Sequence, residues 1–149
     1  MTYSEDEVRL VASFAAEDVS LPPDVMVRIT KDRFIALLSG ALAEAVDGKF
    51  PPDGDSDLIA PYVNELTKRF GATGEELDAP EIEAIILWIR GDRELGDDLE
   101  PNEIIALSIL IIYAIVSEGQ PGVEEVAAFC HAAIERADVF QHTSSTVTD

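Results

Sequence analysis

One long apolar stretch, Ile104 to Val116 (IIALSILIIYAIV), constrains the fold most strongly, because only Ser108 interrupts it. On a helix these side chains would point in every direction, so other elements must surround them. Its ~13 residues, at ~1.5 Å each, reach roughly 20 Å, which is short of the ~30 Å hydrocarbon layer of a membrane. Acidic residues flank both ends. We therefore expect the central helix of an all-α domain and no membrane span.

Helical spacing of apolar residues elsewhere predicts further helices with short connections. The expected ranges are about 5–17, 30–46, 58–70, from 78–81 to near 91, and 123–137, beside the central helix around 104–116, which Pro101 precedes and Gly119 closes. Thr30 is expected to cap the second helix, and Gly48 is placed to end it in the left-handed conformation. The segment 25–29 alternates like a strand, but it has no evident partner strand, so we assign it to a loop or a short helical lead-in.

The length of 149 residues fits one domain. The expected fold is a single-domain bundle of about six helices around one central hydrophobic helix, covering residues 1–140. The tail, 141–149, is rich in Ser and Thr and has no apolar periodicity, so we expect it to be disordered.

The chain carries a formal net charge of −20, from 30 acidic and 10 basic residues. Direct binding to nucleic acid is therefore disfavoured, since such binding depends on Lys and Arg that neutralise phosphates. A strongly acidic surface favours a basic protein partner and attracts it electrostatically. The alternative is that the acidity only keeps the protein soluble.

The cysteine and histidine content is low. The one cysteine, Cys130, allows no internal disulfide and suits a reducing cytosol. The N-terminal residues show no signal-peptide pattern, so we expect a cytoplasmic protein. Cys130 and His131 are adjacent and would point about 100° apart on a helix, which does not suit one metal ion, and we expect Cys130 to be a small core residue.

Sequence motifs for catalysis or for a cofactor are not evident, so we expect a protein that is not an enzyme and has no cofactor. The run Asp53 to Asp57 opens like a calcium-binding loop, with oxygen-bearing side chains at its first, third and fifth positions. An EF-hand then needs Gly at the sixth position and Glu at the twelfth, where this chain has Leu58 and Asn64. A solvated acidic loop is the better interpretation.

Acidic residues gather in the connections between expected helices, where they could form a recognition surface. The expected partner-binding residues are Asp53, Asp55, Asp57, Tyr62, Asp97, Asp98 and Glu100. The carboxylates would steer a basic partner, and Tyr62 would supply an aromatic anchor. An ordinary solvated face is the alternative.

The run Pro52-Asp53-Gly54-Asp55-Ser56-Asp57-Leu58-Ile59 resembles the Pro-Asp-Gly-Ser-Asp-Leu-Ile stretch of the small acidic immunity proteins that neutralise nuclease colicins and pyocins. A later helix with Pro80, Ile82 and Trp88 is similar to the Ser-Pro…Ile-Val…Trp helix of that family. The family motif continues with Tyr-Tyr-Pro, whereas Ala60-Pro61-Tyr62 follows here, and this chain has one extra residue within the motif. The resemblance thus implies a toxin contact only at Asp57 and Tyr62.

A second resemblance is to TerB-like domains of tellurite resistance, in which each half runs a helix into Asp-Gly before an acidic turn. Asp47-Gly48 and Glu118-Gly119 are similar to that arrangement. This resemblance implies a stress-response role, with divalent metal bound through carboxylates such as Asp47 and Glu118.

These observations favour an acidic inhibitor of the immunity-protein or antitoxin type, which would neutralise a basic toxin, a nuclease in the leading hypothesis. The alternatives are a TerB-like metal-binding stress protein and a non-catalytic scaffolding subunit. The sequence leaves the oligomeric state and the partner's identity open.

Overall fold

A computed structural model describes residues 5–15, 23–51, 54–71, 79–91, 100–119 and 122–147. These residues form helices and no strands, so the predicted all-α class is confirmed. The helices are α1 (Glu5–Ala15), α2 (Pro23–Arg28), α3 (Lys31–Lys49), the 3₁₀ turn η1 (Ser56–Leu58), α4 (Ile59–Gly71), α5 (Ala79–Arg90), α6 (Pro101–Glu118) and α7 (Val123–Val147). The segment that alternates like a strand is the short helix α2, in agreement with a helical lead-in.

At the ends of α3 the structure confirms the predicted N-cap but not the predicted C-terminal residue of the helix. Thr30 is extended, with φ −68° and ψ 158°, and its side-chain oxygen accepts the backbone N–H of Arg33, so the predicted N-cap is confirmed. Gly48 does not take the left-handed conformation: α3 continues through Lys49, and the N–H of Phe50 donates to the carbonyl of Val46 at 2.6 Å. The positive φ, +86°, occurs at Gly91, directly after α5.

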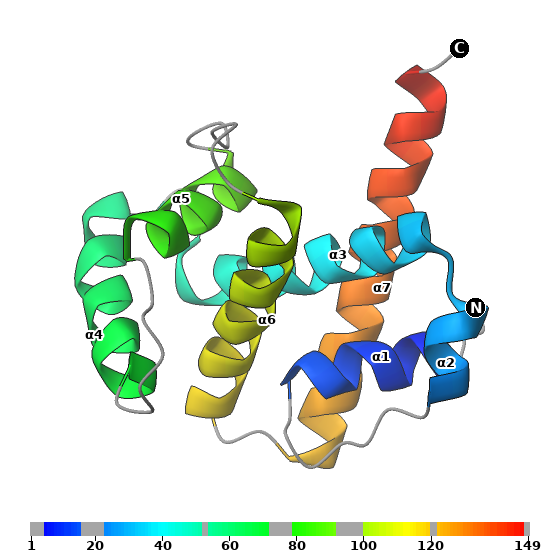
Figure 1. Cartoon of the computed structure of the whole chain (residues 1–149), viewed down its shortest axis with the longest axis horizontal. Helices are drawn as coiled ribbons and strands as arrows, with labels where there is room; N and C mark the ends of the chain where they lie inside the picture. Colours follow the sequence, from blue (N-terminus) through cyan, green and yellow to red (C-terminus); the bar gives the residue numbers. More distant parts are fainter. Residues whose placement is uncertain are drawn as a thin grey trace.

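The centre of the bundle is α3, which packs against α1, α5, α6 and α7 (Figure 1). Its side chains Leu37, Ala41, Leu42 and Val46 are at most 1% exposed. By contrast, only 28% of the α6 residues are buried, and most of its other apolar side chains are half-buried. The prediction that α6 is surrounded on every side was therefore wrong. Small residues in α3 let its neighbours approach closely, which hydrophobicity alone does not reveal.

A close helix contact lies where α7 crosses α3 at a steep angle (Figure 1). Gly40 of α3 is buried there, and a Cβ atom added to it would lie 2.3 Å from the Ala133 carbonyl oxygen and 3.0 Å from the Ala137 nitrogen. Three salt bridges also join the helices: Arg33 of α3 pairs with Asp138 at 2.8 Å, and Arg136 of α7 pairs with Glu44 at 2.7 Å and with Asp47 at 2.8 Å. The α3–α7 pair is thus fixed by both close backbone packing and charge.

Length and apolar composition alone would allow α6 to cross a membrane, and it is the one helix of the described ranges that passes this test. A core helix of a helical domain passes it too. In this fold Ile111, Ile112 and Ala114 of α6 are completely buried, and the helix packs against α1, α3 and α5. That packing accounts for much of its apolar character.

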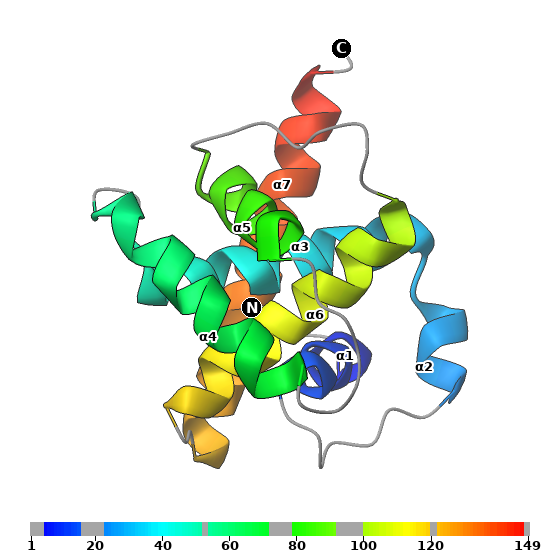
Figure 2. The same ribbon diagram turned by 60° about the vertical axis from the view of Figure 1, so that its left-hand side comes forward.

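The last helix is longer than predicted. The sequence predicted a disordered tail from Gln141, whereas α7 continues to Val147. No glycine or proline occurs between Val123 and Val147, so no residue breaks the backbone hydrogen bonding of the helix. The final turns of α7 stand clear of the other helices (Figures 1 and 2).

Candidate functional site

The turn before α4 contains two of the predicted acidic residues. The carboxylate of Asp55 accepts the backbone N–H of Asp57 at 2.9 Å, and the Asp55 carbonyl accepts the N–H of Leu58 at 3.4 Å. This side-chain bond is the local one by which Asp favours turns. Asp55 therefore shapes η1, while the side chains of Asp55, Asp57 and Leu58 are exposed.

The helix that follows has one buried and one exposed face. Its buried residues include Ile59, Val63 and Leu66. Helical spacing places Pro61 and Glu65 on the opposite side, where both are exposed. We call the exposed group formed by Asp55, Asp57, Leu58, Pro61 and Glu65 the η1–α4 surface.

The apolar residue at the centre of this surface is Leu58, which is 60% exposed. Sequence reasoning missed it because Leu58 and Ile59 are adjacent and equally apolar, and the pattern alone does not say which one faces the core. The structure buries Ile59 completely and leaves Leu58 outside. Large exposed apolar side chains are rare in the described part of the chain, so Leu58 is a candidate anchor for a partner.

Arg90, at the end of α5, holds the segment that leads to η1. Its Nη2 donates to the carbonyl of Pro51 at 2.9 Å and to that of Gly54 at 3.3 Å. The N–H of Gly54 also donates to the Pro51 carbonyl, at 2.8 Å. These bonds tie the start of the acidic turn to the end of α5.

Tyr62, the predicted aromatic anchor, lies inside the protein and is only 8% exposed. Its hydroxyl donates to the Glu118 carboxylate, and its ring packs edge-on against Phe50, with centroids 5.4 Å apart. Lys49 Nζ lies 4.5 Å from the Tyr62 ring centroid and 3.0 Å from Glu118 Oε1. Burial, and then the hydrogen bond to Glu118, raise the pKa of Tyr62. This cluster joins the ends of α3 and α6 to α4, and it does not present Tyr62 to a partner.

The remaining predicted contacts divide into two groups. Asp53, Asp97 and Asp98 lie outside the described residues. Glu100 is exposed and precedes α6 as its N-cap, where its carbonyl accepts the N–H of Ile104 at 3.0 Å. The structure therefore gathers Asp55 and Asp57 with Leu58, and it places Tyr62 elsewhere.

The two carboxylates of the metal-binding alternative are held by different cations. Asp47 pairs with Arg136 Nη1 at 2.8 Å, while Glu118 pairs with Lys49 and Tyr62. Within the ranges that the structure covers, no group of three or more His, Cys, Asp and Glu side chains is arranged to hold a metal ion. Metal binding thus stays a prediction without geometric support.

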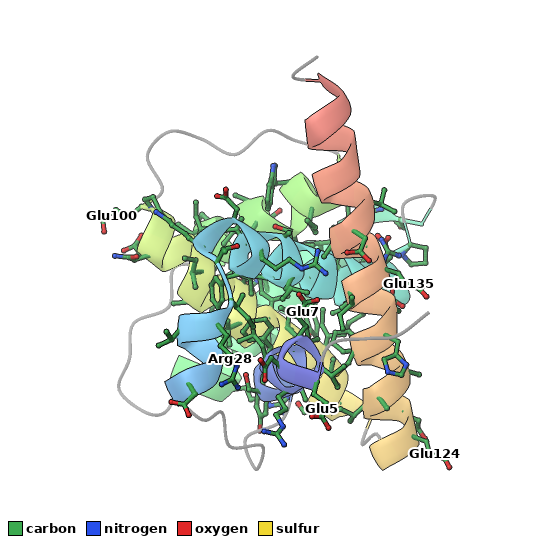
Figure 3. The ribbon with its side chains drawn as sticks, turned by 90° about the vertical axis from the view of Figure 1, so that its right-hand side faces the viewer. Glu5, Glu7, Arg28, Glu100, Glu124 and Glu135 are labelled. Carbon is green, nitrogen blue, oxygen red and sulfur yellow. The ribbon has the colours of Figure 1, made fainter. Side chains whose placement is uncertain are left out.

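Several basic side chains are engaged by acidic residues of the same chain. The ion pairs are Arg28–Asp6, Arg33–Glu7, Arg33–Asp138, Lys49–Glu118, Arg136–Glu44 and Arg136–Asp47. Other acidic side chains point outward, and Glu5, Glu100 and Glu124 lie far apart on the molecule (Figure 3). Negative charge is therefore spread widely over the surface, and the η1–α4 surface differs from the rest by its exposed leucine.

Cys130 is completely buried, as predicted for a core residue, and burial raises the pKa of its thiol to about 11. At pH 8 a thiol with that pKa has about a hundredfold less thiolate than one with the ordinary value of 9.0. We expect a disulfide reagent to react at least about a hundredfold more slowly with the folded protein than with the protein in urea. Absorbance of the released thiolate measures both rates, and equal rates would contradict the burial of Cys130.

Comparisons with protein-family models, with curated proteins and with solved structures found no match to this chain. The two family resemblances of the sequence therefore remain predictions.

Proposed function

We propose that this protein is an acidic inhibitor of the immunity-protein type, which binds a basic protein through the η1–α4 surface. The observation that carries the proposal is the exposed Leu58 beside the exposed carboxylates of Asp55 and Asp57. An apolar anchor within a polar rim is the usual anatomy of a protein interface.

The charge of the whole molecule supports a basic partner. A net charge of −20 attracts a cationic protein over long distances and speeds its association. Arg28, Arg33, Lys49 and Arg136 are paired with carboxylates of the same chain, so they present little free positive charge to repel that partner. The immunity-protein resemblance of the segment from Pro52 to Ile59 points to a nuclease toxin as the partner and to the cytoplasm as the site of action.

The first test is an affinity pull-down from the native organism's lysate, with added nuclease to remove bridging nucleic acid. Salt is stepped from about 0.05 to 0.5 M, because screening weakens exposed charge interactions. The expected result is one basic protein, retained in stoichiometric amount at low salt. Absence of such a protein would contradict the proposal, and heat released on titration with micromolar calcium, magnesium or zinc would favour the metal-binding alternative.

With the captured partner in hand, Leu58→Ala is expected to weaken binding by about tenfold, mainly through faster dissociation. The Asp55→Asn, Asp57→Asn double variant should slow association about twofold to fivefold at low salt and reduce its salt dependence. Asparagine at position 55 can still accept the backbone N–H of residue 57, so η1 is retained. Surface plasmon resonance measures both rates.

The matched control is the double variant Glu124→Gln, Glu125→Gln, which removes the same charge from exposed positions at the start of α7. This control should slow the association rate less than the Asp55→Asn, Asp57→Asn variant does. Equal slowing by both double variants would mean that only net charge matters, and it would remove the η1–α4 surface from the interface.

A further inference from the structure

The segment that leads to the η1–α4 surface is anchored in the core at both of its ends. Phe50 at its start is 5% exposed, and Ile59, directly after η1, is completely buried. The described residues between these anchors include Pro51, Gly54 and Asp55, which are exposed. Because exposed residues gain little from apolar burial, the shape of the turn depends on its hydrogen bonds.

Some of these hydrogen bonds come from Arg90, the last residue of α5. Its Nη2 donates to the carbonyl oxygens of Pro51 and Gly54, at 2.9 Å and 3.3 Å. A single guanidinium therefore joins two points of the turn, and hydrogen bonds from a charged donor are stronger than neutral ones. Helix α5 also packs against α4, so Arg90 extends from an element that is itself fixed beside the surface.

We propose that Arg90 is a positioning residue of the η1–α4 surface, which holds the turn in its partner-binding shape before the partner arrives. The binding role rests on the proposed function, whereas the ordering of the turn is a property of the free protein. A surface that is already ordered loses less conformational entropy on binding, so its affinity is higher. Arg90 acts through the backbone of the turn, and a contact between Arg90 and the partner is not required.

The first part of the test uses the free protein and the variant Arg90→Gln, which removes the charged donor. Exchange of the backbone amides of Gly54 and Asp57 should become about threefold to tenfold faster, because both amides are bonded within the turn. Exchange of core amides, such as those of Leu66 and Ile111, should not change. Nuclear magnetic resonance follows each amide separately, so local loosening is distinguished from a general loss of stability.

The second part measures binding of the captured basic partner by surface plasmon resonance. Loss of one positive charge in Arg90→Gln takes the formal net charge from −20 to −21, which by itself would speed association with a basic protein. We expect instead that binding weakens by about threefold to tenfold, because the turn must be ordered during binding. The effects of charge and of positioning thus have opposite signs.

Two further variants serve as controls. Arg28→Gln removes the same charge from the last residue of α2, where Arg28 pairs with Asp6 at 2.6 Å. It should leave exchange in the turn unchanged and should not weaken binding. Arg90→Lys keeps the charge but lacks the planar fork of donors, so it should lie between the natural protein and Arg90→Gln in both measurements.

Unchanged exchange at Gly54 and Asp57 in Arg90→Gln would overturn the proposal, whether or not a partner is found. Equally faster exchange in the core would also overturn it, since Arg90 would then support only the stability of the whole fold. Faster exchange in the turn with undiminished binding would remove the positioning role and leave the proposed function standing. Faster exchange in the turn without any captured basic protein would overturn the proposed function and, with it, the binding role of Arg90.

Discussion

Replacing Gly40 with alanine is expected to lower the free energy of unfolding by about 3 kcal/mol, the upper end of the usual range for overpacking a core. The added methyl group would lie 2.3 Å from the Ala133 carbonyl oxygen and 3.0 Å from the Ala137 nitrogen. Both are backbone atoms, so no side-chain rotation relieves the overlap and α7 must move as a whole. Urea unfolding, followed by far-UV circular dichroism, measures the loss.

Gly48→Ala is the matched control, because Gly48 lies in the same helix and a Cβ added there meets no atom within 4 Å. Alanine favours the helix over glycine by about 1 kcal/mol, so this variant should be slightly more stable than the natural protein. The opposite signs of the two changes isolate the α3–α7 contact. Equal effects of both substitutions would mean that α7 does not approach Gly40 so closely.

Tyr62→Phe is expected to lower the free energy of unfolding by about 1.5–3 kcal/mol at pH 7, the range for a hydrogen bond to a charged group. The ring stays in place against Phe50, and only the hydroxyl that donates to Glu118 is lost. Lys49→Met is the comparison: the Lys49 side chain is 32% exposed, so its ion pair should contribute no more than about 1 kcal/mol. A variant without the hydroxyl that is as stable as the natural protein would contradict the buried bond.

The same variant tests the pKa of Tyr62. Burial and the Glu118 bond raise that pKa in the folded state above the ordinary value of 10.0, so the folded protein holds the phenol proton more tightly than the unfolded chain. The resulting stability is complete below pH 10 and is lost as the pH rises further. Urea unfolding between pH 7 and pH 11 should therefore show the natural protein and Tyr62→Phe converging. Ionisation of Cys130 affects both proteins alike and cancels in the difference.

Local sequence pattern was enough to predict the fold class and several helix boundaries. Helical spacing found each long helix, and the Thr30 cap is where the sequence placed it. Gly48 shows the limit of this reasoning: a glycine suits a helix end, but here the hydrogen bond from Phe50 to Val46 extends the helix past it. Whether a glycine ends a helix depends on the residues that follow.

Other features could not be predicted from the sequence, because they depend on contacts between residues far apart in the chain. Tyr62 was predicted at the surface, yet its ring is buried by Phe50 and its hydroxyl finds an acceptor on Glu118, far away in the chain. Leu58 and Ile59 are similarly apolar, and the structure exposes Leu58, in the turn that Asp55 holds, while it buries Ile59. The close approach of α7 to α3 at Gly40 depends on the absence of a side chain there, so no apolar pattern in the sequence predicts it.

Helix α7 crosses α3 steeply at Gly40, and the close contact there is the point about which α7 could rotate relative to α3. The ion pairs of Arg33 and Arg136 join the two helices and resist that rotation. From Ala137 the helix continues to Val147, a lever of roughly 15 Å at ~1.5 Å per residue. A rotation of about 10° at the pivot would move the end of that lever by about 3 Å. The carboxylates that pair with the two arginines thus set the direction in which the C-terminal end of α7 points. Gly40 sets the distance between α7 and α3.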